Sequence, residues 1–326
     1  MALLEVRNLG VRLQTQRGPA AAVRGLSFSL ERGETLGLVG ESGCGKSITA
    51  MALMGLLPEN AVVSGSIRFD QQDLVGQRDE TLQQLRGNRI GMIFQEPMTA
   101  LNPLHSVGRQ VAEPLRLHRG ASRAAARRQA LALLDRVGIA DATRRFDAYP
   151  HQFSGGQRQR ITIAMALACE PDLLIADEPT TALDVTIQGQ ILDLISALVQ
   201  ERGMALLLIS HDLGVIAENV SRMMVMYGGM VVESGPTAVV FRHMAHPYTR
   251  GLFGARPQLG SGRGRRLSTI EGTVPELVDL PAGCPFLERC PRSAADCAAM
   301  PSAVELGQSH QASCWHLDRS ADAITP

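Results

Sequence analysis

A glycine-rich loop is the stretch of this sequence with the clearest chemical meaning. It follows the apolar run 35–39 and precedes the helix-prone stretch 48–54. With the first residue of the expected helix, its residues are Gly40, Glu41, Ser42, Gly43, Cys44, Gly45, Lys46, Ser47 and Ile48. Glycines let backbone N–H groups converge on one point, and the following helix directs further donors to it. In the pattern G-x-x-x-x-G-K-[ST], the lysine reaches the terminal phosphates of a nucleotide and the hydroxyl binds Mg²⁺. We therefore expect Lys46 and Ser47 to hold a nucleoside triphosphate and its metal.

Four polar side chains at the ends of apolar strands could complete the chemistry. Hydrolysis of a triphosphate needs a metal, an activated water and stabilisation of negative charge. Asp177 ends an apolar strand and is suited to support Mg²⁺, while Glu178 is the candidate base for the water. Gln95 ends a second strand, where it can ligate the metal and the water. His211 ends a third and can bond the γ-phosphate, although a histidine at a strand end is by itself more typical of a structural core residue.

A second glycine pair opens another expected helix. Ser154, Gly155, Gly156 and Gln157 lie at the start of a helix that runs through residues 161–167. The free N–H groups and the dipole of a helix N-terminus favour anions. These residues therefore predict an anion site in addition to the glycine-rich loop.

The elements that would position these groups alternate along the chain. Apolar strands followed by helices predict an α/β fold with a parallel sheet, whose ligands bind beyond the carboxyl ends of the strands. Period-2 patterning in residues 3–39, continued at 65–70, predicts a small antiparallel sheet beside that core. The helix-prone composition from about residue 96 indicates a helical subdomain that ends near residue 165. After Tyr227 the helix–strand rhythm fades, residues 260–266 have the composition of a flexible basic linker, and a tail rich in Pro and Cys follows.

Composition limits the partners of the chain. Its 326 residues carry 32 acidic and 32 basic side chains, so no overall field favours nucleic acid or an anionic membrane. The N-terminus lacks the pattern of a secretory signal, and no run approaches the ~20 apolar residues that span a bilayer. We expect a soluble, cytosolic chain that reaches a membrane only through partners. The arginines within 116–128 fit a solvated helix face better than a nucleic-acid patch, because no aromatic residues alternate with them.

Taken together and in this order, the motifs resemble those of ABC-transporter ATPases. The matching segments are 40–47 (Walker A), Gln95 (Q-loop), 153–157 (signature), 173–178 (Walker B), Ala182 to Asp184 (D-loop) and His211 (H-loop). The resemblance covers about residues 3–256 and implies an ABC ATPase domain over 1–256 that binds ATP and Mg²⁺. It also implies that the signature caps ATP held on the Walker A loop of a partner ATPase. The chain has a matching residue at every catalytic position of the family, Glu178 and His211 included, which implies that it is competent for hydrolysis. Arg12 or Leu13 stands where the family usually stacks an aromatic ring on adenine, so base stacking stays open.

Two further segments resemble the ATPases of oligopeptide, dipeptide and nickel importers and extend the likeness to about residue 316. Residues 95–103 with 107–110 are similar to the segment that meets the coupling helix of the permease, and residues 246–252 to the C-terminal hallmark of this group. The resemblance implies two transmembrane permeases, a second ATPase subunit that is homologous or identical, and an extracytoplasmic solute-binding protein, with no nucleic acid. It implies a peripheral position on the cytoplasmic side of the bacterial inner membrane. The solute stays open, because this subunit does not touch it. The alternative is a soluble ABC ATPase acting on nucleic acid or ribosomes, which the neutral charge and the permease-contact segment disfavour.

Four of the six cysteines lie in the expected linker and tail, residues 257–326. Cys284, Cys290, Cys297 and Cys314 have the spacing C-x5-C-x6-C-x16-C. Four thiolates can hold zinc or a four-iron–four-sulfur cluster, and this spacing matches neither a zinc ribbon nor a ferredoxin. Importer ATPases with a similar tail are linked to an iron–sulfur cluster, so the resemblance favours the cluster over zinc or free thiols. Cys44 and Cys169 are expected to be small packing residues.

Overall fold

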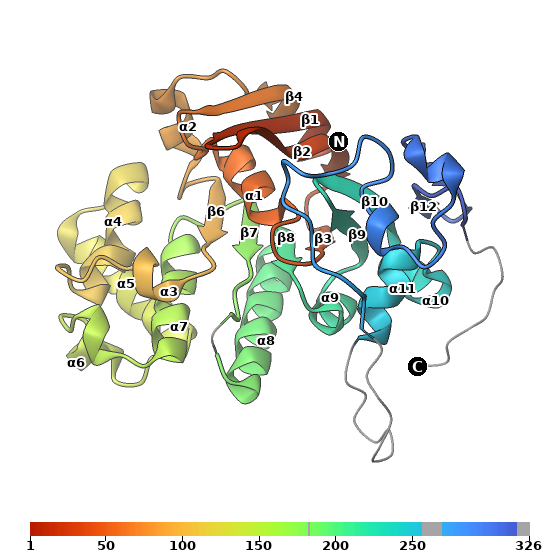
Figure 1. Cartoon of the computed structure of the whole chain (residues 1–326). Helices are drawn as coiled ribbons and strands as arrows, with labels where there is room; N and C mark the ends of the chain where they lie inside the picture. The colour runs from red at the N-terminus through yellow and green to blue at the C-terminus, as the bar shows by residue number, and fades with distance from the viewer. Residues whose placement is uncertain (182, 256–268, 318–326) are drawn as a thin grey trace, which may run out of the picture.

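The computed structural model describes residues 1–181, 183–255 and 269–317, which form a large mixed sheet, a small antiparallel sheet and the helices around them (Figure 1). The large sheet has the strand order β11-β12-β10-β9-β3-β8-β7-β6. Its strands are β3 (Thr35–Val39), β6 (Ile90–Ile93), β7 (Leu173–Asp177), β8 (Ala205–Ser210), β9 (Arg222–Tyr227), β10 (Met230–Pro236), β11 (Val304–Glu305) and β12 (Gln311–Ala312). The neighbours from β6 to β9 pair in parallel, which confirms the predicted parallel core. Strands β10 to β12 add an antiparallel edge.

The central strands are apolar on both faces because each face contacts a separate core. In β7, Leu173 and Ile175 pack with the small sheet and α1 (Lys46–Met54), whereas Leu174 and Ala176 pack with the helices of the opposite face. The helices below the sheet in Figure 1 are α8 (Val185–Arg202) and α9 (Leu213–Asn219). Strands that are buried on both faces have continuous apolar sequences, which explains why the apolar runs in the sequence identified them.

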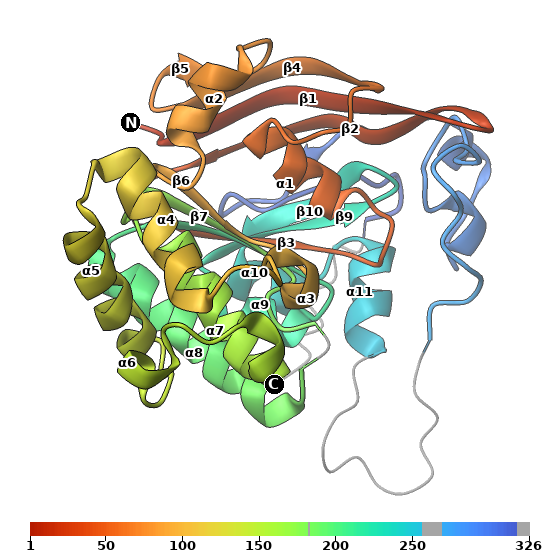
Figure 2. The same cartoon turned by 90° about the vertical axis from the view of Figure 1, so that its left-hand side faces the viewer.

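The small sheet lies over α1 and has the order β2-β1-β4-β5 (Figures 1 and 2). Its strands are β1 (Leu4–Thr15), β2 (Gly18–Leu30), β4 (Ala61–Phe69) and β5 (Gln72–Asp73). The predicted antiparallel sheet is confirmed, with longer strands than the patterning indicated. Asp172, at the start of β7, accepts hydrogen bonds from Arg32 after β2 and from Arg89 before β6. This ion-pair cluster joins the small sheet to the core.

The expected helical subdomain contains only helices among the described residues. They are α3 (Pro97–Ala100), α4 (Val107–Arg119), α5 (Arg123–Arg136), α6 (Ala142–Arg145), the 3₁₀ turn η1 (Pro150–Gln152) and α7 (Gly155–Ala166). A further short helix, α2 (Asp79–Leu85), precedes β6. The subdomain extends from the β6 end of the sheet, at the left in Figure 1, where α7 lies apart from α1.

The prediction that regular structure fades after Tyr227 is wrong. Gly228 and Gly229 adopt positive φ angles of 54° and 79°, which allow a tight hairpin from β9 into β10. Helices α10 (Thr237–His243) and α11 (Pro247–Gly254) follow. Sequence patterning missed β10 because Gly235 and Pro236, two poor strand formers, lie within it.

The described tail packs against the core instead of standing apart from it. It contains the short 3₁₀ turns η2 (Leu287–Arg289) and η3 (Ala295–Ala298), and β12 pairs with β10 of the large sheet. The expected linker, 260–266, lies outside the described residues, and the division at residue 256 stays a prediction. Within the described part of the chain, no helix is both long and apolar enough to cross a bilayer.

Candidate nucleotide-binding and catalytic site

The glycine-rich loop joins β3 to α1 as the sequence predicts. Gly45, just before the helix, has a φ of +103°, and a Cβ atom there would lie 2.3 Å from the carbonyl oxygen of Ala22. A Cβ on Gly40 would lie 2.2 Å from the carbonyl oxygen of Met226. Glycine is therefore required where the loop passes β2 and β9. The Lys46 ammonium is 4% exposed and donates to the carbonyl oxygens of Gly40 (2.7 Å) and Glu41 (3.1 Å), so it lies across the loop.

An oxygen pair suited to Mg²⁺ lies beside the loop. The Ser47 hydroxyl donates to the Asp177 carboxylate at 3.1 Å, and Asp177 is 4% exposed at the end of β7. Burial raises the pKa of Asp177, against the opposing effect of the Ser47 hydrogen bond. A hydroxyl and a carboxylate are hard ligands of the type that Mg²⁺ selects next to substrate phosphates. The residues present therefore fit this ion.

The Glu178 carboxylate contacts the remaining predicted catalytic side chains. Its Oε2 lies 3.1 Å from His211 Nδ1 and accepts hydrogen bonds from Gln95 Nε2 (3.3 Å) and Thr181 Oγ1 (3.0 Å). Its Oε1 lies 3.7 Å from Lys46 Nζ. The ends of β6, β7 and β8 thus bring Gln95, Glu178 and His211 to one point, as parallel strands with neighbouring carboxyl ends require.

The backbone of Glu178 is strained into this position. Its φ is +47°, in the left-handed region that non-glycine residues rarely adopt, and its N–H donates to Ile209 O at 2.9 Å. Such strain persists where surrounding structure imposes it, and it concentrates at functional sites. As a result, the neighbouring carboxylates have different partners: Asp177 contacts Ser47, whereas Glu178 contacts Gln95 and His211.

The second predicted anion site is a well-formed helix N-terminus. Ser154 caps α7 in a capping box, in which its hydroxyl accepts from Gln157 N–H while the Gln157 side chain accepts from Ser154 N–H. Ser154 and Gly155 are exposed. Within the described residues, no hydrogen bond joins this segment to the loop 40–47. Ala182 of the predicted D-loop lies outside the described residues.

The four tail cysteines are free thiols in the described tail. Cys284 and Cys297 are buried, while Cys290 and Cys314 are half-buried. Burial raises the pKa of Cys284 to about 11, with smaller contributions from the other three thiols, and burial also raises the pKa of Cys290 and Cys314. Among the described residues, one group of three side chains that could bind a metal has all its ligand atoms within 4.8 Å of one another: Asp296, Cys297 and His316. A tetrahedral zinc site would bring all four sulfurs within about 4 Å of each other, so the cysteines are spread more widely than zinc requires.

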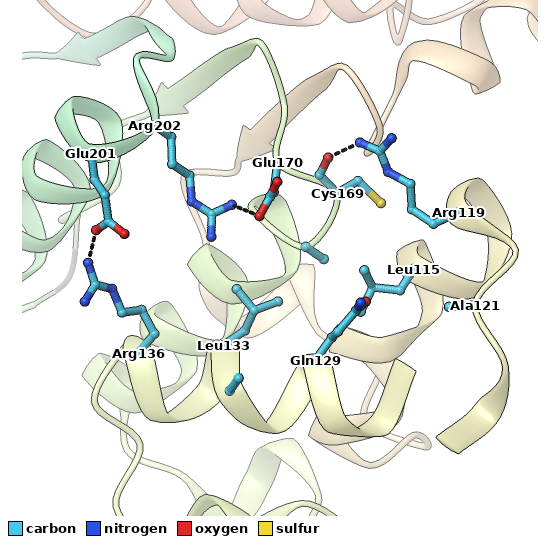
Figure 3. Close-up of a pocket in the computed structure, with 12 residues that line it drawn as sticks. Leu115, Arg119, Ala121, Gln129, Leu133, Arg136, Cys169, Glu170, Glu201 and Arg202 are labelled. Carbon is cyan, nitrogen blue, oxygen red and sulfur yellow. Dashed lines mark hydrogen bonds and ion pairs between the residues drawn. The ribbon is translucent and has the colours of Figure 1, made fainter. Parts of the chain in front are cut away.

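The cavity in Figure 3 lies away from these groups. It measures about 700 Å³ and lies between α4, α5 and the C-terminal end of α8. Arg202 pairs with Glu170 at 3.1 Å, Arg136 pairs with Glu201, and Arg119 donates to the Cys169 carbonyl. The charged side chains that line this cavity are therefore bonded within it. None of the residues predicted for the nucleotide site or the tail cysteine site lines it. The predicted packing residue Cys169 does line it and is buried as expected.

Sequence reasoning missed three residues that contact the site. Thr181 bonds Glu178, and the Tyr248 hydroxyl accepts from the backbone N–H of Glu41 at 2.9 Å. Arg289, from the tail, forms an ion pair with the Glu41 carboxylate. Tyr248 lies in the segment 246–252 that the sequence singled out, but no local pattern signals Arg289, because its partner is distant in the sequence.

A glycine-rich loop at a helix N-terminus beside the buried carboxylates of Asp177 and Glu178, with a second helix N-terminus exposed on a helical insert, is the arrangement of an ATP-binding cassette. Residues 23–181 match the ABC transporter family, and residues 232–297 match the family described as oligopeptide/dipeptide transporter, C-terminal region. The chain therefore belongs to the ATP-binding subunits of the oligopeptide/dipeptide group of ABC transporters.

Individual relatives agree with this assignment. The dipeptide transport ATP-binding protein DppD of Bacillus subtilis is 49% identical over 98% of this chain and 96% of its own length. A putative peptide import ATP-binding protein of Brucella melitensis is also 49% identical, over 96% of each chain. Among solved structures, the ATP-binding cassette MJ0796 in a dimeric post-hydrolysis state with ADP and Pi has a TM-score of 0.65 and 28% identity, covering 72% of this chain and 98% of that one. The predicted family and cassette fold are thus confirmed.

Proposed function

We propose that this chain hydrolyses ATP to energise a bacterial importer of dipeptides, oligopeptides or a related small solute. The observation that carries the proposal is the convergence of Gln95, His211 and Lys46 on Glu178, beside the Ser47–Asp177 pair. Family membership supplies the transport context, since the relatives named above carry dipeptide transport and peptide import in their names.

In this proposal, the backbone N–H groups of 40–48 and the Lys46 ammonium bind the phosphates of ATP. Ser47, Gln95 and Asp177 hold Mg²⁺, which supplies neutralisation of the charge that develops on the transferred phosphoryl group. Glu178 accepts a proton from the attacking water. Thr181 orients its carboxylate, and His211 moves between this carboxylate and the γ-phosphate.

The exposure of Ser154 and Gly155 at the N-terminus of α7 supports a composite site. Ser154, Gly155, Gly156 and Gln157 would bind the γ-phosphate of ATP held by a second ATPase subunit, and that subunit would return the same contact. Two such subunits would enclose two nucleotides and separate after hydrolysis.

The substitution Glu178→Gln tests the catalytic assignment. The amide keeps the size of the side chain but accepts no proton, so kcat should fall by about 10²–10⁴-fold while the Kd for MgATP changes little. Glu170→Gln, an exposed residue just before the same strand, is the matched control and should leave both constants unchanged. Near-normal turnover by Glu178→Gln would remove Glu178 from the role of base.

The proposed partners are two membrane permeases, a second ATPase and an extracytoplasmic binding protein, with this chain on the cytoplasmic side of the inner membrane. In the segment expected to meet the permease, 95–103, Met98 is 63% exposed, and the flanking residues Phe94 (43%) and Leu104 (81%) are exposed as well. Large exposed apolar side chains in one short stretch of chain favour a protein partner. A tagged chain purified from detergent-solubilised membranes should bring down two polytopic proteins and a second ATPase. Recovery of ribosomal or nucleic-acid-binding proteins in their place would refute the transport assignment.

For the tail we propose a four-iron–four-sulfur cluster on Cys284, Cys290, Cys297 and Cys314. Support comes from the four cysteines standing as free thiols in the one described tail, where the other three thiols each raise the pKa of Cys284, and from the resemblance of this tail to those of importer ATPases linked to such a cluster. Protein purified without oxygen should be brown and contain iron and acid-labile sulfide. A colourless protein that contains zinc would refute the cluster.

A further inference from the structure

The nucleotide loop is in contact with the cysteine-containing tail. Arg289 lies in η2, between Cys284 and Cys290, and its guanidinium binds the Glu41 carboxylate with both nitrogens. The Nη1–Oε2 distance is 2.7 Å and the Nη2–Oε1 distance is 3.0 Å. The Arg289 side chain is 5% exposed and that of Glu41 is 27% exposed. A bidentate, desolvated pair of this kind fixes orientation as well as distance.

Glu41 is also held at its backbone. Its N–H donates to the Tyr248 hydroxyl at 2.9 Å, and its carbonyl accepts from Lys46 at 3.1 Å. One loop residue therefore connects α11, the phosphate-binding lysine and the tail. A shift of Glu41 would move the carbonyl that Lys46 uses as its anchor.

The tail segment that carries Arg289 is itself anchored by an aromatic cluster. Phe286 is 1% exposed, and its ring lies 5.1 Å from that of Tyr227 and 5.3 Å from that of Tyr248. Arg289 also approaches the Tyr227 hydroxyl at 3.4 Å. The residues between Cys284 and Cys290 are thus docked behind the nucleotide loop, and any ligand that joins these two cysteines would fix both ends of the docked segment.

We propose that Arg289 is a positioning residue of the ATP site, through which the docked tail sets the affinity for nucleotide. This inference rests on the proposed function and adds a regulatory element to the same site. Two effects act in the same direction. Arg289 neutralises a carboxylate next to the bound triphosphate, and it holds the loop in the conformation that directs Lys46 and the N–H groups to the phosphates. Arg289 contacts neither Glu178 nor His211, so the proposal predicts an effect on binding and not on the chemical step.

The test compares Arg289→Ala with a variant that removes a different contact between tail and core. Arg17, in the β1–β2 turn, pairs with the tail residues Glu276 (2.7 Å) and Asp279 (2.7 Å) and is 55% exposed. Arg17→Ala therefore removes a similar ion pair without touching the loop. The Kd for a fluorescent MgATP analogue, KM and kcat for ATP, and the melting temperature are measured for each variant.

Arg289→Ala should raise Kd and KM about tenfold, because an unpaired carboxylate remains beside the phosphates, while kcat changes by less than about threefold. Arg17→Ala should leave Kd and KM unchanged. Glu41→Gln added to Arg289→Ala should restore Kd to within about threefold of the wild type, since it removes the uncompensated charge. If Arg289→Ala is too unstable to assay, Arg289→Gln, which keeps most of the side chain but not the charge, takes its place with the same expected rise in Kd and KM.

Unchanged nucleotide affinity in Arg289→Ala would overturn the inference, as would an equal loss in Arg17→Ala. Failure of the double variant to recover would likewise exclude the charge mechanism. These outcomes are distinct from a failure of the proposed function. If the wild-type chain bound MgATP but did not hydrolyse it, the catalytic proposal would fall while the binding comparison would still test Arg289.

Discussion

His246 is expected to make the stability of the fold dependent on pH. It is 1% exposed and caps α11, where its Nδ1 accepts from the Tyr248 N–H at 3.1 Å. Its Nε2 has no hydrogen-bond partner among the described residues. Burial lowers the pKa of His246 from its ordinary 6.5 to about 4, against the opposing effect of Glu233. Protonation would also remove the acceptor that caps the helix.

The sign and size of the effect follow from this shift. As the pH falls below 6.5, the unfolded chain binds a proton at His246 that the folded chain does not bind until about pH 4. The unfolded state is therefore favoured increasingly over this window, by about 1.4 kcal/mol per pH unit and about 3 kcal/mol in all. Below about pH 4 both states are protonated, and this contribution is lost completely. Above pH 6.5 it is fully present.

The perturbation is His246→Asn, because an asparagine oxygen can cap the helix in place of Nδ1 but does not titrate. Urea unfolding followed by circular dichroism gives the free energy of unfolding at pH 7.5 and pH 4.5. Between these values the wild type should lose about 2.5 kcal/mol more than His246→Asn. The exposed His151, which stacks on Tyr149, supplies the control, and His151→Asn should follow the wild-type profile. If wild type and His246→Asn lose stability in parallel, the buried neutral histidine is not the cause.

Two further substitutions test the packing of the loop and the join between the sheets. Gly45→Ala places a Cβ 2.3 Å from the Ala22 carbonyl oxygen at a φ of +103°, so it should lower the melting temperature and abolish MgATP binding in a titration. In contrast, Gly189→Ala in α8 meets no atom within 4 Å and should stabilise the protein by up to about 1 kcal/mol; equal effects of the two would contradict the steric argument. Asp172→Asn weakens the contacts with Arg32 and Arg89 and should cost about 1 kcal/mol in urea unfolding, less at high salt because these groups are partly exposed. A loss that does not depend on salt would show that packing, and not charge, joins the two sheets at this point.

Local sequence was sufficient for the elements whose chemistry is local. The loop 40–47 and strand β7 were predicted close to their observed bounds, because each carries its own signal: glycines before a Lys–Ser pair, or an apolar run that ends at a carboxylate. Strand β10 was missed because it contains Gly235 and Pro236, and it forms a strand in spite of them because it pairs with β9 and β12.

The sequence by itself therefore determined the family and predicted the type of chemistry: a triphosphate loop, a metal pair, a base and a second anion site, each from residue types at fixed spacing. Only the tertiary structure decided which groups meet. It brings Gln95 and His211 to one carboxylate, strains Glu178 into place, and sets Arg289 on Glu41 across 248 positions of the chain. Contacts of this kind depend on how the strands and the tail pack in three dimensions. Residues so far apart in the sequence share no local periodic pattern, so a single sequence does not predict that they meet.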